Sequence, residues 1–241
     1  MDTAAGKYYF TADVHLGSKD DSHGVLERQF VDFLHSIPKE AEALYLLGDI
    51  FDFWVDYREV VPRGYVRVLA ALAELVDRGV KVFFYPGNHD WWVTDYFEKE
   101  LGVKTVHESY QVVELDGRRI CVGHGDMPGA SDFKSRFLFN LFRNRFCIAM
   151  MKALPTRLSF AIAHGWSARS RKGHSEEFDP KSTGLYRFVD GFGRKRAQSG
   201  EPAIDLYIFG HIHTPARIPV PNGGELVVLG DWSQGPQYFC I

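Results

Sequence analysis

The sequence predicts an α/β fold, because short apolar runs alternate with amphipathic stretches and because polar side chains follow the ends of those runs. Of the 241 residues, 45% are hydrophobic and 24% are charged. A chain of this length and composition can bury a sizeable core and is not expected to be disordered. We therefore expect one domain with an elaboration.

Six apolar runs are expected to be strands. Each is rich in Val, Ile, Leu, Phe or Tyr and is bounded by Gly, Pro or a charged residue, which is typical of a buried strand. The six runs are Lys7–Ala12, Ala43–Leu47, Lys81–Tyr85, Arg119–Val122, Asp205–Phe209 and Glu225–Leu229.

Helices are expected between the first three strands and shortly after the third. Val25–Ser36 and Tyr65–Arg78 place apolar residues at helical spacing, and Gly79 stands where a C-cap belongs. Thr94–Leu101 has the pattern of a shorter helix that ends at Gly102. Strands that alternate with helices in this way imply an α/β architecture.

Composition excludes several classes of protein. The net charge of −3 argues against a general nucleic-acid binder. The three cysteines are far apart and odd in number, so they favour a reducing compartment over a disulfide scaffold. No apolar run approaches the ~18 residues of a membrane span, and the first residues lack the features of a secretory signal. We expect a cytoplasmic protein.

The connection from His124, which follows the fourth expected strand, to His211, which follows the fifth, is too long for a simple crossover, because the two residues are 87 positions apart. We expect residues 1–126 and 203–241 to form the core and residues 127–202 to form a helical cap. Gly191–Pro202 has the pattern of a helix tail that runs into a loop.

Residues 133–172 contain nine basic residues and no acidic one, among many aromatic and aliphatic side chains. This composition allows a helical cap whose apolar face packs on the core. It also allows a lid with an apolar groove for acyl chains and a basic rim for phosphates or anionic lipid. The aromatic residues cluster with aliphatic ones, so nucleic acid is not the expected partner.

Five expected strands are each followed by Asp, Asn or His residues. The resulting motifs are Asp13-Val14-His15, Gly48-Asp49-Ile50-Phe51-Asp52, Gly87-Asn88-His89-Asp90, Gly123-His124-Gly125-Asp126 and Gly210-His211-Ile212-His213. Ligands bind at the carboxyl edge of α/β sheets, so these side chains are expected to converge. Any one motif alone is more often a structural feature, such as a turn or helix cap, than a metal site.

Taken together, the motifs indicate a metal site built from oxygen and imidazole donors. Such donors without thiolates suit Mn²⁺, Fe²⁺ or Zn²⁺. Seven donors exceed the needs of one ion and favour two ions that share a bridging carboxylate, for which we expect Asp49. The seven are Asp13, His15, Asp49, Asn88, His124, His211 and His213.

In this order the motifs resemble those of the calcineurin-like metallophosphoesterase superfamily, whose blocks run D-x-H, G-D-x-x-D, G-N-H-[DE], G-H and G-H-x-H. The resemblance implies a four-layer α/β/β/α sandwich of two mixed sheets flanked by helices. It also implies the distribution of ligands between the metals. One metal would take Asp13, His15, Asp49 and His213, and the other would take Asp49, Asn88, His124 and His211.

Two such ions can clamp a phosphoryl group and activate a bridging hydroxide, which would attack phosphorus in line. The best candidate for the proton donor to the leaving group is His89, because it follows Asn88 and lies outside the ligand set. Either Asp90 or Asp52 would hold its imidazole. A packing or substrate-orienting role for His89 stays open.

A narrower resemblance is to the bacterial UDP-2,3-diacylglucosamine pyrophosphohydrolases of lipid A synthesis. It rests on the extended motif Gly48–Trp54, the position of the cap, the basic stretch Ser167–Lys172 and the ending Leu229-Gly230-Asp231-Trp232. It implies hydrolysis of UDP-2,3-diacylglucosamine to 2,3-diacylglucosamine 1-phosphate (lipid X) and UMP, usually with Mn²⁺. It also implies peripheral attachment to the anionic inner face of the bacterial inner membrane.

The same resemblance implies contacts with the substrate. Phosphate and sugar would be contacted by Asn88, His89 and Asp126, and the uridine and pyrophosphate would be flanked by Ser170, Arg171 and Lys172. Many members of that family carry Arg where this chain has His89.

Two other functions are compatible with the sequence. The first is another metal-dependent phosphodiesterase or phosphatase that acts on a nucleotide or small phosphoester. The second is a non-catalytic scaffold that docks on a membrane or a protein, against which the complete ligand set argues.

Overall fold

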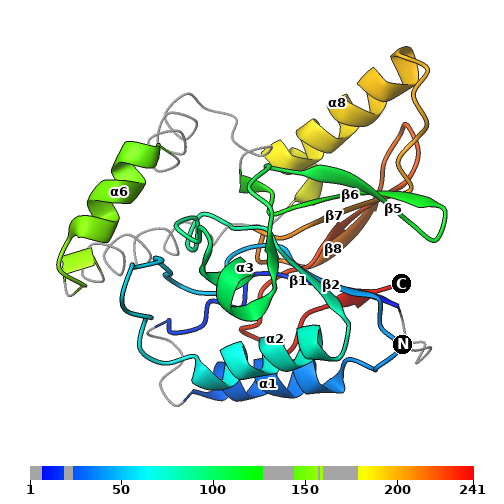
Figure 1. The fold of residues 1–241 in the computed structure, drawn as a ribbon. Helices are drawn as coiled ribbons and strands as arrows, with labels where there is room; N and C mark the ends of the chain where they lie inside the picture. The colour runs from blue at the N-terminus through cyan, green and yellow to red at the C-terminus, as the bar shows by residue number, and fades with distance from the viewer. Residues whose placement is uncertain (1–6, 19–23, 127–143, 157, 160–178) are drawn as a thin grey trace.

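The computed structural model describes residues 7–18, 24–126, 144–156, 158–159 and 179–241. Two five-stranded sheets face each other, and helices cover their outer faces (Figure 1). Helices α1 (Val25–Ser36), α2 (Val66–Asp77) and α3 (Tyr96–Leu101) pack on the first sheet, and α8 (Gly184–Gln198) packs on the second. The predicted four-layer α/β/β/α sandwich is confirmed.

The first sheet has the order β10-β1-β2-β3-β4. Its strands are β1 (Tyr8–Thr11), β2 (Ala43–Leu46), β3 (Lys81–Phe84), β4 (Lys104–Thr105) and β10 (Phe239–Cys240). Strands β1 to β4 run parallel, and β10 pairs antiparallel with β1. The carboxyl ends of β1, β2 and β3 therefore lie at one edge of the sheet.

The second sheet has the order β5-β6-β7-β9-β8. Its strands are β5 (Gln111–Leu115), β6 (Arg118–Gly123), β7 (Leu206–Phe209), β8 (Ala216–Pro219) and β9 (Glu225–Val228). The three central strands, β6, β7 and β9, are parallel, whereas β5 and β8 are antiparallel edges. Both sheets are mixed, as predicted.

Alternate side chains of a central strand pack into two different apolar clusters, one on each face of the sheet. In β1, Tyr8 and Phe10 point between the two sheets, whereas Tyr9 points toward the helices of the first sheet. The inner layer joins these residues to Ile120 of β6 and Ile208 of β7. The sheets are thus held face to face by a common apolar layer.

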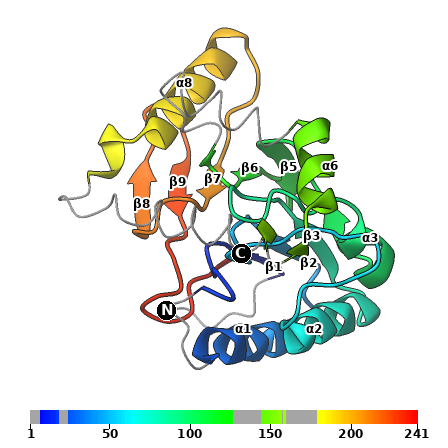
Figure 2. The ribbon, with the colours of Figure 1, turned by 90° about the vertical axis from the view of Figure 1, so that its left-hand side faces the viewer.

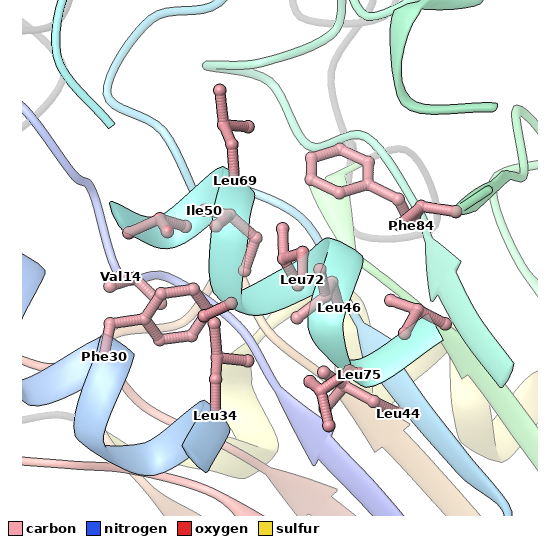
Figure 3. Close-up of a cluster of buried hydrophobic side chains, with 14 of the residues drawn as sticks. Val14, Phe30, Leu34, Leu44, Leu46, Ile50, Leu69, Leu72, Leu75 and Phe84 are labelled. Atoms are coloured by element: carbon pink, nitrogen blue, oxygen red, sulfur yellow. The ribbon is translucent and has the colours of Figure 1, made fainter. Parts of the chain in front are cut away.

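A second apolar cluster fixes α1 and α2 on the first sheet. Figure 3 shows residues of both helices packed with residues of β2 and β3 and of the loops that follow β1 and β2. The labelled side chains are Val14, Phe30, Leu34, Leu44, Leu46, Ile50, Leu69, Leu72, Leu75 and Phe84. Because Val14 and Ile50 belong to this cluster, the loops that carry the predicted ligands are anchored in the core.

Helix α8 follows a short 3-10 turn, Pro180–Ser182, and ends at Gln198. The prediction that Gly191–Pro202 contains a helix tail and a loop agrees with this end. The helix lies over the second sheet (Figure 2), where Leu185 and Val189 pack with residues of β7 and β9. The helix therefore packs on the second sheet, although it falls within the predicted cap range 127–202; the domain division stays a prediction.

Helix α6 (Arg145–Ala153) also falls within the predicted cap range, and it lies apart from α8 (Figures 1 and 2). None of the helices in the described ranges is long and apolar enough to cross a membrane.

Candidate metal centre

Loops from both sheets bring the predicted ligands together. Asp13 and His15 follow β1, and Asp49 follows β2, the central strand of the first sheet. Asn88 follows β3, and from the second sheet His124 follows β6, while His211 and His213 follow β7. The contacts below join these loops into one site.

One group of donors is formed by Asp13, His15 and His213. The Nε2 atoms of the two histidines lie 3.3 Å apart, and they lie 3.9 and 3.7 Å from Oδ1 of Asp13. Asp13 is fully buried, and this oxygen has no hydrogen-bond partner among the described residues. A buried carboxylate oxygen without a partner, facing two imidazole nitrogens, fits a divalent cation.

A second group of donors is formed by Asp49, His124 and Asn88. Nε2 of His124 lies 3.4 Å from Oδ2 of Asp49 and 3.3 Å from Oδ1 of Asn88. Nδ1 of His124 lies 2.8 Å from the carbonyl oxygen of Leu47, so an Nδ1–H donor there leaves Nε2 free to bind a metal. Ligand atoms of Asp13, Asp49 and His124 also lie within 4.8 Å of one another, which links the two groups.

His211 lies beside the second group. The centroid of its ring is 5.2 Å from that of His124, and its backbone N–H donates to Oδ2 of Asp13 at 2.8 Å. Burial lowers the pKa of His211 to about 3, and the charge of His124 acts in the same direction. A neutral imidazole is the form that binds a metal.

Backbone strain is concentrated in this site. Asp13, His15 and Asp49 have φ of 52°, and His211 has φ of 65°, in the left-handed region that residues with a Cβ rarely adopt. Such strain costs of order 1–3 kcal/mol per residue and gathers at functional sites. Gly87 permits the closest approach, because a Cβ there would lie 2.3 Å from Oδ1 of Asp49 and 2.8 Å from Nε2 of His124.

The charges of the donors perturb one another. Burial raises the pKa of Asp13, and the charge of Asp49 raises it further. Burial would also raise the pKa of Asp49, but His124 and other histidines outweigh it and hold this pKa well below its usual range. Burial opposes the charged form of His124, yet Asp49 raises its pKa. In the absence of metal, the carboxylate of Asp49 and the charged form of His124 therefore stabilise each other.

Asp52 is the carboxylate beside the His89 imidazole. Nδ1 of His89 lies 3.6 Å from Oδ1 of Asp52 and 3.1 Å from its backbone oxygen. Oδ1 of Asp52 is also 3.9 Å from Nδ1 of His15. His89 is buried, and its Nε2 lies 4.0 Å from Oδ2 of Asp49, so its second nitrogen faces the donor groups.

Asp90 has a different environment. Its carboxylate accepts hydrogen bonds from the backbone amides of Asp49, Ile50, Phe51 and Gly87, at 2.8 to 3.2 Å. Burial and the nearby charge of Asp49 raise the pKa of Asp90 to about 7. The geometry gives Asp90 a role in shaping the loop of Asp49 and places Asp52 beside His89.

The structure adds Asp231, to which the sequence assigned no role. Oδ2 of Asp231 lies 3.4 Å from Nδ1 of His213, where it can orient that ring. Asp231 follows β9, so its position after a sixth strand was the available signal. Asp126 is buried two residues beyond His124 and raises the pKa of that histidine. Ser170, Arg171 and Lys172 lie outside the described residues.

Helix α6 has one packed face and one exposed face. Ile148 and Met151 of α6 pack against Phe53, Val55 and Trp92 of the core, whereas Phe146 and Met150 are 71% and 53% exposed. The packed face agrees with a cap that rests on the core, while a lid for acyl chains stays a prediction. The aromatic residues of 133–142 lie outside the described ranges.

Known proteins are similar to this chain over most of its length. A family model described as "Calcineurin-like phosphoesterase" matches residues 6–215. A UDP-2,3-diacylglucosamine hydrolase from Porphyromonas gingivalis is 37% identical over 96% of this chain and 92% of its own length. A protein of the same name from Haemophilus influenzae strain PittGG is 29% identical over 93% of this chain and 90% of its own length.

Among solved structures, a Streptococcus pneumoniae protein described as a predicted phosphoesterase aligns with 98% of this chain and 78% of its own, at 13% identity and a TM-score of 0.40.

Proposed function

Because this chain belongs to the calcineurin-like phosphoesterase family, we propose that it is the hydrolase that cleaves the pyrophosphate bond of UDP-2,3-diacylglucosamine, giving 2,3-diacylglucosamine 1-phosphate and UMP. The curated relatives that carry this activity in their names match nearly the whole chain, cap range included. The family match indicates a hydrolase, and the Asp/His clusters indicate that it binds divalent metal.

The observation that carries the proposal is the convergence of donors from both sheets. Asp13 belongs to two groups of mutually close ligand atoms, one with His15 and His213 and one with Asp49 and His124. Asn88 and His211 lie beside His124, and the set includes no thiolate. We assign Asp13, His15, Asp49 and His213 to one metal and Asp49, Asn88, His124 and His211 to the other. Mn²⁺ is the proposed ion, and Fe²⁺ and Zn²⁺ fit the same donors.

When bound, two divalent cations supply Lewis acidity toward the phosphate oxygens and lower the pKa of water toward ~7. The chain's own residues orient the substrate and move the proton. His89 faces the donor groups through Nε2 and would donate a proton to the oxygen that leaves phosphorus as the P–O bond breaks. Asp52 would orient the imidazole of His89 through the opposite ring nitrogen, which lies 3.1 Å from its backbone oxygen and 3.6 Å from its Oδ1.

The leaving group explains a difference expected between substrates. In the lipid substrate the departing oxygen belongs to a phosphate, which carries its charge well without protonation. An alkoxide leaving group needs the proton far more. Donation from His89 should therefore matter more for simple alkyl phosphodiesters than for the pyrophosphate.

We further propose peripheral attachment to an anionic membrane on its cytoplasmic side. The support is the apolar face of α6 with exposed Phe146 and Met150, and the absence of acidic residues from 133–172. Asn88, His89 and Asp126 would contact phosphate and sugar. Ser170, Arg171 and Lys172 would flank the uridine and pyrophosphate.

The decisive experiment incubates purified, Mn²⁺-loaded protein with UDP-2,3-diacylglucosamine and follows UMP. Release of UMP with one equivalent of lipid X is the expected result. Turnover of a generic phosphodiester without UMP release would favour the second candidate, a phosphodiesterase acting on a nucleotide or small phosphoester. Purified protein that takes up no Mn²⁺, Fe²⁺ or Zn²⁺ would instead favour a non-catalytic scaffold.

A further inference from the structure

Helix α6 rests on the two loops that carry Asp52 and His89. Its seat consists of Phe53, Val55 and Trp92, which are all buried and form one apolar cluster with Ile148 and Met151 of the helix. The rings of Phe53 and Trp92 meet edge to face, with centroids 5.5 Å apart. Phe53 comes directly after Asp52, and Trp92 is the third residue after His89.

A polar chain joins the same helix to the same loops. Nζ of Lys152 donates to Oγ1 of Thr94 at 2.9 Å, and that hydroxyl donates to Oδ2 of Asp56 at 2.9 Å. Oδ2 of the buried Asp56 also accepts from the backbone amides of Thr94, Asp95 and Tyr96, at 2.6 to 3.1 Å. We call the chain Lys152–Thr94–Asp56 the α6 latch.

The loop of Asp56 is in turn bound to the loop of His89. The backbone N–H of Asp56 donates to the carbonyl oxygen of Trp92 at 3.3 Å, and Val55 and Trp92 form an isolated parallel bridge. The indole of Trp54 donates to Oδ1 of Asp56 at 2.6 Å. This arrangement fixes the register of the two loops within three or four residues of the Asp52–His89 contact.

We propose that the α6 latch positions His89 for proton donation, with Lys152 as a positioning residue that acts through Thr94 and Asp56. The proposal rests on the role of His89 in the proposed function. Docking of α6 closes Phe53 and Trp92 against each other, and this holds the loop of Asp52 against the loop of His89. Loss of the latch leaves the metal donors in place but lets the imidazole drift from its partner.

The test uses two phosphodiesters that differ in their need for a proton. Bis(4-nitrophenyl) phosphate releases a stable phenolate, whereas a dinucleoside phosphate releases a sugar alkoxide. Lys152→Met keeps the aliphatic stem and removes the ammonium group, Thr94→Val removes the hydroxyl at constant shape, and Lys152→Arg restores a donor. Lys195→Met, at an exposed position of α8, is the matched control.

Lys152→Met and Thr94→Val should lower kcat for the dinucleoside phosphate about tenfold and change kcat for the nitrophenyl ester less than about twofold. Lys152→Arg should restore most of the loss, and His89→Ala should show the same substrate dependence. Metal content should not change, while amide hydrogen exchange in 145–153 should become faster in Lys152→Met than in Lys195→Met.

Equal losses on the two esters would overturn the proposal, because they would show a general structural effect. Unchanged kcat despite faster exchange in α6 would also overturn it, as would a wild-type protein that hydrolyses neither ester. Neither ester is the lipid substrate. Failure to release UMP from UDP-2,3-diacylglucosamine would therefore remove the proposed function and leave this result standing.

Discussion

Gly87 shows how little space the donor loops leave at the scale of single residues. A Cβ at this position would approach the backbone nitrogen of Asp49 to 2.7 Å as well as the side chains of Asp49 and His124. Backbone atoms cannot move aside as a flexible side chain can. The glycine is therefore required by the close approach of β2 and β3 loops, and not by its own φ.

Gly87→Ala should accordingly lower the metal content of purified protein to well below half, because it displaces a shared ligand. Metal analysis by mass spectrometry together with circular dichroism checks this. Gly79→Ala is the control, because Gly79 lies outside the site and no atom would lie within 4 Å of a Cβ there. The φ of 93° at this position means that alanine is strained, so the control carries backbone strain without a clash. A Gly87→Ala protein with full metal content would contradict this prediction, because it would show that the two loops can move apart to accept the Cβ.

His89→Ala should reduce turnover of an alkyl phosphodiester about 10²-fold while the metal content stays unchanged. Turnover should fall because Nε2 of His89 faces the donor groups. Metal content should stay unchanged because Nδ1 contacts Asp52 and His89 lies outside the proposed ligand set. Steady-state kinetics and metal analysis on the same preparation check both parts. Loss of metal in this variant would reassign His89 as a ligand.

Ligand positions could be predicted from sequence because each follows an apolar run directly, so that position along the chain fixes position in space. The partners of those residues could not. Asp90 is next to His89 in sequence and Asp52 is 37 positions away, yet the fold turns Asp90 toward four backbone amides and places Asp52 beside the imidazole. The contact of Asp231 with His213 joins residues 18 positions apart, which no local pattern reports.

At the scale of elements, the six predicted strands are the buried ones and the four that sequence missed are edges. Strands β4 and β10 have two residues each, too few for any pattern. Strands β5 and β8 lie at the edges of the second sheet, where exposed polar residues interrupt the apolar run. A strand that is buried on both faces has a continuous apolar run, and such a run can be recognised in the sequence.

The exposed face of α6 supports a prediction on lipid binding. Replacing Phe146 and Met150 by Ser should weaken binding to anionic vesicles about tenfold or more and raise KM for a long-chain substrate more than for a short-chain one. Vesicle sedimentation and kinetics check this. Val112→Ser, at an exposed position of β5, is the control. Equal effects on both chain lengths would assign these side chains to folding alone.

At the scale of the whole molecule, the metal centre lies where the carboxyl ends of the two sheets meet. Asp13, His15, Asp49 and Asn88 come from the first sheet, and His124, His211 and His213 come from the second. The sheets already share an apolar layer, so metals bound here would act as a second connection between the sheets at one edge. Binding of metal should therefore stabilise the fold as a unit.

Metal removal should lower the thermal midpoint by several degrees. Mn²⁺ at about 100 times its Kd stabilises the folded state by about 2.7 kcal/mol, which corresponds to about 5–10 °C for a chain of this size. Calorimetry with and without chelator checks this. Asp49→Asn should abolish the shift, because it replaces the bridging donor, whereas Asp77→Asn, at an exposed position of α2, should retain it.

The size of this shift should depend on pH, because the metal competes with a proton. Asp49 raises the pKa of His124 in the metal-free protein, although burial opposes the charged form. As pH falls, the higher proton concentration competes more strongly with the metal for the same donors, so the difference in midpoint between metal-loaded and metal-free protein should shrink. Titration calorimetry in buffers of different ionisation enthalpy should show proton release on binding at neutral pH. A shift that is constant between pH 8 and pH 6, with no proton released, would mean that the ion does not bind between Asp49 and His124.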